Sequence, residues 1–496
     1  MAFDSTYPHG SDEWWLRMLH ARLSARPEWQ PTRVTESRRG LMPRDEWLST
    51  LWAYRTGAPP LPRHHGADMR QDMRDFLRAG RANYAGLSVE QLLNVVTLLG
   101  VRSTESRDGS TDDALRRVMQ ESGPWFADAA DYCFSMGESA VMVGGTKERP
   151  VITAEDPRNL VVVTDPLDRM HVTRALKVRV DEWTGATSAH LFVDEGPGEE
   201  RVRVAVRDSG AGWSWDDSRS GPLPLRGMGL PIVPMPNKLG LGEFEPHLDV
   251  LDRINNGIAD RLWIAKAQAF RQLALVADKD AEEIEGVDEH GTPIDLDEIF
   301  QLAPDSLLQI PKGWRLWEAA AVDLRQHLEA VDKDVREFSS TSGTPLTATM
   351  TDAVNQSAEG ARAASETRDA KARDRIARLS PAVVRVARLV AAVAGMDDLM
   401  KAPLEPLWAP IGQESAVSRG QAALSAMTVG LPQEMVWSDI LELTPDQVAR
   451  ARRLRDADAL RALAQQQVAD ARAARQSPAV AAALTPAPVS DVGAGA

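Results

Sequence analysis

The stretch from Glu245 to Gly360 constrains the fold most strongly, because two long helix-forming segments flank an acidic insertion. Residues 246–275 start with a proline, which suits the first turn of a helix, and then carry apolar residues at intervals of three and four. At about 1.5 Å per residue, that helix is about 45 Å long. Residues 321–340 repeat the pattern. Helices this long with an apolar stripe need packing neighbours along their whole length.

The apolar stripes of the two helices define an expected packing surface. Their members recur on one side of each helix, as the helical period requires. They are Leu248, Leu251, Ile254, Ile258, Leu262 and Leu273 on the first helix and Leu324, Leu328, Val331 and Val335 on the second.

The insertion at 276–320 predicts a compact excursion with a strongly acidic start. Asp278, Asp280 and Glu282 fall at the first ligand positions of an EF-hand loop, with Glu289 at the last. Glu283, however, stands where the calcium loop needs glycine for its sharp turn. We therefore interpret the segment as a solvated acidic surface and expect no metal. The residues of interest are Asp280, Glu282 and Glu283, with Trp314 and Trp317 as a small core.

A small, polar loop is predicted after the second helix, because the chain is uncharged from Ser339 to Met350. The loop spans 341–354, and its residues of interest are Ser342, Gly343, Thr344, Pro345, Leu346, Thr347 and Thr349. Residues 355–395 then predict a long helix rich in alanine and charged residues. Pro381 is expected to kink or re-cap that helix.

The remaining segments predict an α+β protein that is mostly helical. Residues 1–135 contain helical patterns, among them 88–99, where Ser88 and Gln91 suit a capping box, while 111–136 predicts one further helix. Residues 138–235 carry short β-branched runs separated by turns, which indicate a mostly antiparallel sheet. Residues 404–475 are again helical, and 477–496 form an Ala/Pro/Gly tail that we expect to be disordered.

Composition excludes several classes of protein. The chain has 496 residues, more than one ordinary core accommodates. Its formal net charge of −15 argues against ordinary nucleic-acid binding through clustered lysine and arginine. No apolar run approaches the roughly 20 residues that span a bilayer, so we expect no membrane partner. Cys133 is the single cysteine, and its apolar context indicates a buried core residue.

Motifs for catalysis are missing from the sequence. It contains no phosphate-binding loop, no metalloprotease signature and no nucleophilic serine motif, so we expect no catalytic residue and no cofactor. His64 and His65 lack a surrounding ligand set, and we interpret them as a solvated loop pair. Trp14 and Trp15 are interpreted as core or subunit contacts, since no basic cluster lies among them.

Four segments, taken in order, resemble the portal proteins of tailed double-stranded DNA bacteriophages, of siphovirus type and most similar to those of phages that infect actinobacteria. The segments are Leu51–Pro62, Pro236–Glu245 with Leu251–Asn255, Ser342–Leu346 with Asn355–Ala361, and Glu405–Trp408 with Ser415–Thr428. The resemblance implies a wing at 1–245, a stem helix at 246–275, a clip at 276–320, a second stem helix at 321–340, a tunnel loop at 341–354, a long wing helix at 355–395 and a crown at 396–476.

The resemblance also implies a function. Portal subunits form a ring, usually of twelve, at one capsid vertex of the virion, and assemble in the host cytoplasm. Double-stranded DNA passes through the channel, and the partners are the terminase large subunit, a head–tail connector, and the major capsid and scaffold proteins. The stem stripes would pack between neighbouring subunits and the tunnel loop would face DNA. Twelve copies would carry 12 × −15 = −180 charges, which suits a conduit to which DNA must not adhere.

Basic residues along the long helix have two interpretations under this resemblance. They pair with acidic residues of the next subunit, or they form pairs four residues apart in their own helix, as Asp369 with Arg373 would. The residues are Arg362, Arg368, Lys371, Arg373 and Arg375.

Two other functions stay open at this point. An intracellular helical adaptor or scaffold protein without a DNA channel would be a monomer or dimer. An enzyme whose acidic site is assembled from distant residues would show a concave pocket with carboxylates of shifted pKa.

Overall fold

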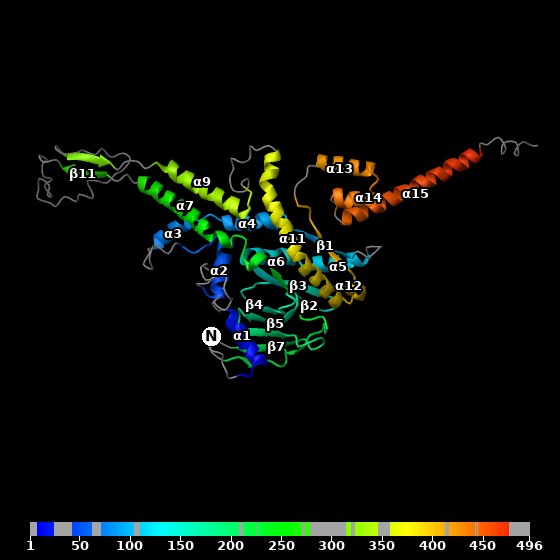
Figure 1. The fold of residues 1–496 in the computed structure, drawn as a ribbon, viewed down its shortest axis with the longest axis horizontal. Coiled ribbons are helices and arrows are strands. Elements are labelled where there is room, and N and C mark those ends of the chain that lie inside the picture. Colours follow the sequence, from blue (N-terminus) through cyan, green and yellow to red (C-terminus); the bar gives the residue numbers. More distant parts are fainter. Residues whose placement is uncertain are drawn as a thin grey trace, which may run out of the picture. The chain divides into compact units, whose positions relative to one another are not determined.

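The computed structural model describes residues 7–23, 42–61, 71–103, 110–207, 212–225, 227–269, 273–277, 314–318, 323–345, 358–411, 416–441, 443 and 445–475. These residues form a mixed helical and β-sheet protein, as predicted (Figure 1). The chain divides into two compact units, Met1–Ile411 (unit 1) and Gly412–Ala496 (unit 2). The tail predicted at 477–496 lies outside the described residues.

The N-terminal part of unit 1 is mostly helical, as predicted. Its helices are α1 (Asp12–Leu23), α2 (Arg44–Arg55), α3 (Gln71–Ala79), α4 (Tyr84–Leu93), α5 (Ser110–Glu121) and α6 (Trp125–Met136). The single helix predicted over 111–136 was wrong. Gly123, with a left-handed backbone, and Pro124, which precedes the first residue of α6, divide it into two.

The helix predicted over 88–99 was also wrong in its bounds. Helix α4 begins after Asn83, whose side chain accepts a hydrogen bond from Gly86 N at 2.8 Å, so Asn83 rather than Ser88 is the cap. Ser88 lies inside the helix. The residues that follow form strand β1 (Leu98–Ser103), because an antiparallel partner, β13 (Leu404–Trp408), lies beside them.

Two antiparallel sheets fill the region predicted to be β-rich. One has the order β10-β2-β3, and the other runs β4-β5-β6-β7-β8 with β9 also paired to β7. The strands are β2 (Glu138–Gly145), β3 (Pro150–Glu155), β4 (Leu160–Thr164), β5 (Val172–Val180), β6 (Thr187–Val193), β7 (Arg201–Arg207), β8 (Ser214–Trp215), β9 (Gly221–Pro222) and β10 (Ile232–Pro236). Helix α1 packs Leu16 and Leu19 on the larger sheet, against Leu176 and Leu191.

The main core of unit 1 is built around one long helix, α11 (Ala358–Ala394). Its second half buries an apolar run that includes Val383, Val386 and Val390, and the helix packs against α5 and strands β2, β3, β10 and β13. Pro381 lies inside the helix, which continues past it. A short helix, α12 (Asp397–Lys401), follows the left-handed Gly395. The long helix predicted at 355–395 is therefore the central support of the unit.

Unit 2 consists of helices alone in its described residues. Helix α13 (Ala416–Thr428) is followed by α14 (Gln433–Met435), which runs into a π-helical turn η7 (Val436–Ile440), and then by α15 (Pro445–Arg475). Its small core is Ala423, Ala426 and Val436. The helices predicted within 404–475 are confirmed for the described residues from 416 on. The start of that range was wrong, because Leu404–Trp408 forms strand β13, which pairs with β1.

Gly137 lies where the end of α6, the start of β2 and the loop after β10 meet. Gly137 ends α6 with φ 88°, and its N–H donates to Cys133 O at 2.8 Å. A Cβ atom at this position would lie 2.4 Å from Gly240 O. Both the left-handed backbone and the close approach therefore require glycine.

We expect Gly137→Ala to lower the free energy of unfolding by roughly 3 kcal/mol or more. The cost of the left-handed backbone for alanine and the cost of the clash with Gly240 O add together. The matched control is Gly185→Ala, where φ is 70° but nothing lies within 4 Å of a Cβ. Strain alone should cost about 1–2 kcal/mol there. Urea unfolding followed by tryptophan fluorescence measures both, and equal losses would contradict the argument.

Candidate functional site

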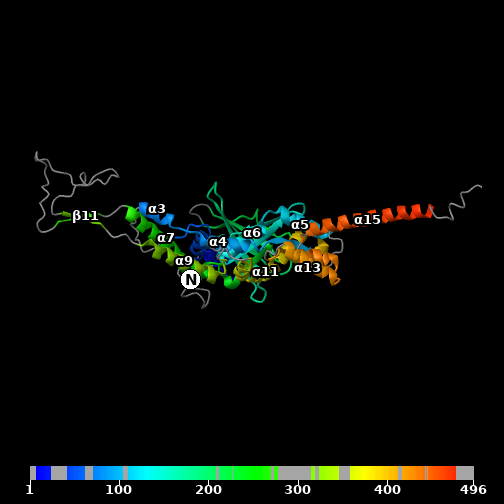
Figure 2. The ribbon, with the colours of Figure 1, turned by 90° about the horizontal axis from the view of Figure 1, so that it is seen from above.

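The two helices predicted as stem helices form an arm. Helices α7 (Leu248–Ala269) and α9 (Leu324–Ser342) lie side by side and leave the rest of unit 1 together (Figures 1 and 2). At their far end, strands β11 (Leu273–Ala277) and β12 (Trp314–Glu318) pair antiparallel. The term arm is used below for these four elements.

The first helix of the arm is shorter than predicted. It ends at Ala269, and Leu273, expected on the helical stripe, is the first residue of β11 and pairs with Glu318. Leucine and alanine favour helices by propensity, but a neighbouring strand offers hydrogen-bond partners for the backbone, and pairing overrides the propensity. The prediction for Leu273 was therefore wrong.

Helices α7 and α9 pack antiparallel and closely. Arg253 donates to Asp334 Oδ1 at 2.9 Å and to Glu337 Oε2 at 2.6 Å. One turn further out, a Cβ atom on Gly257 would lie 2.9 Å from Val331 Cγ2, so glycine allows the two backbones to approach. The contacts fix the register of the two helices.

Helix α7 also packs against the segment that contains α3. A Cβ atom on Gly80 would lie 2.9 Å from Ala259 Cβ, and Asn255 Oδ1 accepts a hydrogen bond from Ala82 N at 2.9 Å. Phe76 and Trp263 meet edge to face, with ring centroids 5.5 Å apart. The inner part of the arm is thus held between α3 and α9.

The predicted packing stripe serves the chain's own core in its inner half. Leu248, Leu251 and Ile254 are buried in the core of unit 1, and Val331 and Val335 are buried with them. Their expected place between neighbouring subunits was therefore wrong. Ile258, Leu262 and Leu324 are half-buried. Leu328 is 41% exposed and Trp263 is 49% exposed, so the outer half of the arm keeps apolar surface open.

The first residues of the predicted tunnel loop form a structured helix end. Helix α9 continues to Ser342, and Gly343 caps it with φ 71°. Thr344 N donates to Ser339 O at 3.1 Å, and the hydroxyls of Ser342 and Thr344 lie 2.8 Å apart. Ser342, Thr344 and Pro345 are buried, so in this chain they do not present side chains to DNA, and this part of the prediction was wrong.

The remaining predicted site residues belong to the loop after α9 and to the segment between the two arm helices. Leu346, Thr347 and Thr349 of the loop, and Asp280, Glu282 and Glu283 of the clip, lie outside the described residues. Trp314 and Trp317 lie on β12, opposite Ala277 and Ala274 respectively.

A buried carboxylate lies at the inner end of the arm, where α7 begins and α9 ends; this end is called the root of the arm. Glu243, in the loop between β10 and α7, accepts hydrogen bonds from Arg375 Nε at 2.5 Å and Arg375 Nη2 at 3.1 Å. Lys371 Nζ lies 2.6 Å from the second oxygen and also donates to Ser342 O at 3.0 Å. Asn237 Nδ2 donates to Glu243 at 2.9 Å. The Glu243 side chain is only 3% exposed.

The cluster keeps Glu243 ionised. Burial alone raises the pKa of the carboxyl, but the hydrogen bond from Arg375 and the charges of Lys371 and Arg375 outweigh burial and hold the pKa below its usual value. Burial, with the Glu243 charge nearby, raises the pKa of the Cys133 thiol. Cys133 is fully buried, which confirms its interpretation as a core residue.

Sequence reasoning placed Lys371 and Arg375 on a charged helix face but missed their partner. The sequence left two partners open for these basic residues: an acidic residue of the next subunit, or one four residues away in the same helix. Neither holds for Lys371 and Arg375, because both bind Glu243, which lies 132 residues before Arg375 in the same chain. Arg368 bonds the adjacent Asp369 at 2.8 Å, and Arg373 is exposed. The side chain of Arg362 lies outside the described set. Only the three-dimensional fold brings Glu243 to α11.

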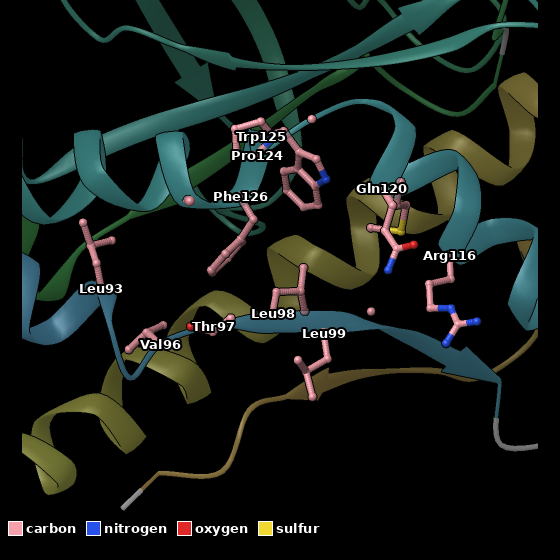
Figure 3. Close-up of a pocket in the computed structure, with 14 residues that line it drawn as sticks. Leu93, Val96, Thr97, Leu98, Leu99, Arg116, Gln120, Pro124, Trp125 and Phe126 are labelled. Atoms are coloured by element: carbon pink, nitrogen blue, oxygen red, sulfur yellow. The ribbon is translucent and has the colours of Figure 1, made fainter. Parts of the chain in front are cut away.

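Two cavities in the described part of unit 1 differ in their lining. A cavity of about 200 Å³ between β1, α5 and α6 is lined mainly by apolar residues such as Leu98, Trp125 and Phe126, with Arg116 and Gln120 at one side and no carboxylate (Figure 3). A more open hollow beside β7 contains Glu195 and Glu200. The hydrogen bond from Arg201 lowers the pKa of Glu195, and backbone N–H groups lower that of Glu200 although burial opposes them.

Neither a membrane span nor a metal-binding cluster occurs in the part of the chain that the structure describes. No helix there is both long and apolar enough to cross a bilayer. No group of three or more His, Cys, Asp or Glu residues there could hold a metal ion. His64 and His65 lie outside that part.

Comparison with known proteins gives low similarity. No family model and no curated protein matches the chain. A solved chain described as "Neck of native GTA particle computed with C12 symmetry" is 15% identical with a TM-score of 0.37, covering 73% of this chain and 94% of that one. A second, "Neck of empty GTA particle computed with C6 symmetry", is 14% identical with a TM-score of 0.39, covering 75% and 97%. Likenesses this low carry no argument, and the proposals below rest on this chain's own residues.

We expect Glu243→Gln to lower the free energy of unfolding by about 3–5 kcal/mol at pH 7, because it leaves the buried Arg375 and the half-buried Lys371 without their counter-charge. The pKa of Glu243 is lower in the folded chain, so ionised Glu243 stabilises the fold fully above its ordinary pKa of 4.5 and loses that effect as pH falls further. Urea unfolding at several pH values should therefore show the gap between wild type and variant narrowing below about pH 4.5.

The matched control for this prediction is Glu405→Gln. Glu405 pairs with Arg102 at 3.0 Å, but both side chains are 49% exposed. An exposed pair should contribute about 0–1 kcal/mol. A loss at Glu243 no larger than that at Glu405, or one that does not change with pH, would contradict the role given to the cluster.

Proposed function

We propose that this chain is the subunit of a portal ring, a structural protein at one capsid vertex of a tailed bacteriophage, whose channel conducts double-stranded DNA in packaging and ejection. The observation that carries the proposal is the arm. Two antiparallel helices leave a compact body, hold a strand pair at their far end and lead on to the long core helix α11. This order supports the stem, clip, stem and wing helix that the sequence resemblance implies.

The charge of the sequence between β11 and β12 suits a DNA conduit. Residues 278–313, which join β11 to β12, contain eleven acidic residues and two lysines, so 2 − 11 = −9 of the chain's net −15 lies there. Carboxylates repel phosphate, and each lysine or arginine contact to phosphate would add affinity and slow translocation. A ring of such arms would guide DNA without holding it.

Ring closure needs a different surface on each side of a subunit, because neighbours in a ring meet head to tail. The exposed Trp263 and Leu328 on the outer half of the arm supply apolar area for that contact. The arms of adjacent subunits would pack side by side around the channel, usually twelve of them, while the inner halves stay in each subunit's own core.

The partners follow from this arrangement. The far end of the arm would meet the terminase large subunit during packaging and the head–tail connector afterwards. The body would contact the major capsid and scaffold proteins, in a particle assembled in the host cytoplasm and retained in the virion. The role is structural and uses no catalytic residue, metal or cofactor.

We expect the purified full-length chain to assemble, and light scattering after size exclusion measures its mass. Twelve copies of 54.3 kDa give about 650 kDa. Leu328→Asp should reduce the assembled fraction about tenfold or more, because a desolvated charge in an interface costs at least about 1.4 kcal/mol. Leu167→Asp is the control, since Leu167 is 98% exposed in the turn between β4 and β5.

A chain that stays at 54.3 kDa at high concentration and with scaffold protein present would contradict the ring and favour the adaptor or scaffold alternative. Equal loss of assembly in the Leu328 and Leu167 variants would contradict the contact through the arm.

A further inference from the structure

Unit 2 has too small a core for its size. Among the side chains of unit 2 that the structure describes, the buried apolar ones are Ala423, Ala426 and Val436, with Ile440 and Leu441 packed against them. So few buried side chains cannot offset the conformational entropy of ordering helices α13 to α15. Unit 2 therefore needs to bury more apolar surface than it buries by itself.

One such surface lies at the end of α13 and in the turn after it. Four large apolar side chains are exposed within eight positions: Leu424 at 68%, Met427 at 49%, Val429 at 83% and Leu431 at 42%. We call these four residues the α13 patch. Scattered exposed leucines are ordinary, but a contiguous group marks a contact surface.

The second surface runs along α15. Leu454, Leu460 and Val468, with Ala457 and Ala464 between them, recur at intervals of three and four and so lie on one side of the helix. Leu454, Leu460 and Val468 are 58%, 68% and 53% exposed, and Leu463 beside them is 57% exposed. This group is called the α15 stripe. An isolated helix with such a stripe is marginal in water.

The α15 stripe does not reach the α13 patch of its own chain. Helix α15 is tied to α14 near its start, where Arg452 donates to Glu434 at 2.7 Å. From there it runs away from α13 and α14 as a straight rod in both views (Figures 1 and 2). The helix ends at Arg475, so its 20 residues after Arg455 extend about 30 Å beyond that tie. A second copy of unit 2 offers an α13 patch that the stripe can meet.

The charges along α15 favour a second copy in the same orientation. Arg450, Arg452, Arg453 and Arg455 give the start of the helix a charge of +4 over residues 450–455. Residues 456–470 hold three aspartates and one arginine, so their net charge is 1 − 3 = −2. The aspartates in the middle of one α15 therefore complement the arginines at the start of the next, which lies beside the α13 patch. Asp456 and Asp458 also pair within their own helix, with Arg455 at 3.4 Å and Arg461 at 3.2 Å.

We propose that the α15 stripe of each subunit docks on the α13 patch of the adjacent subunit, with the acidic middle of one α15 lying along the arginine-rich start of the next. The contact is head to tail and repeats around the assembly, because each copy supplies one surface to each neighbour. The number of copies joined by this docking rests on the proposed ring. The docking itself uses surfaces of unit 2 and none of the arm.

Cysteine cross-linking between differently tagged full-length chains tests the contact. One chain carries Leu460→Cys and the other Met427→Cys, and the two are co-expressed. Native Cys133 is fully buried and gives little background. A short bifunctional maleimide should yield a covalent dimer carrying both tags. The matched control replaces Leu460→Cys by Gln466→Cys, on the opposite side of α15, and should give on the order of tenfold less, since the two thiols are then not held together.

The outcomes separate this proposal from the ring itself. Rings that form without the Leu460–Met427 cross-link, or with equal cross-linking from Gln466→Cys, overturn the docking and leave the portal proposal intact. If the cross-link forms in dimers or in open-ended assemblies but no closed ring is found, the docking is supported and the portal proposal is contradicted. A chain that stays monomeric and forms no cross-link overturns both.

Discussion

The arm depends on one buried carboxylate and the two cations that neutralise it. Glu243 precedes α7, Ser342 ends α9, and Lys371 and Arg375 lie on α11. Because Lys371 bonds both Glu243 and the last carbonyl of α9, the start and the end of the arm are fixed to the same helix. Removing one partner from a buried ion cluster is costly, whereas the complete cluster holds a specific geometry. A force on the far end of the arm is therefore passed to the core of unit 1.

The sequence predicted the elements better than their contacts. The 3.6-residue period located both arm helices, and β-branched runs located the sheets, because each signal is local. Leu273 and residues 98–103 became strands because partners far away in the chain lie beside them. The cluster of Glu243 with Arg375 was missed because a lone charged residue carries no signal of its partner. Ser342 and Thr344 looked like an exposed loop, although the cap formed by Gly343 buries them.

The proposed conduit for DNA would set opposing demands, which different parts of the chain would meet. Rigidity is needed where subunits meet, and the close approach of α7 and α9 at Gly257 and the ion cluster at the root supply it. Weak adhesion would be needed where DNA passes, and the net charge of −9 in the sequence between β11 and β12 suits that need. Unit 2 adds apolar surfaces suited to contact between copies. The same net acidity that argues against a DNA-binding protein therefore suits one that lets DNA slide.

The most direct test of this account is electron cryo-microscopy of the assembled full-length chain. The account predicts a closed ring with an open central channel, in which the α7–α9 arms stand side by side around the channel and α11 lies behind their roots. A particle without a channel, or a ring whose arms point away from its axis, would contradict it.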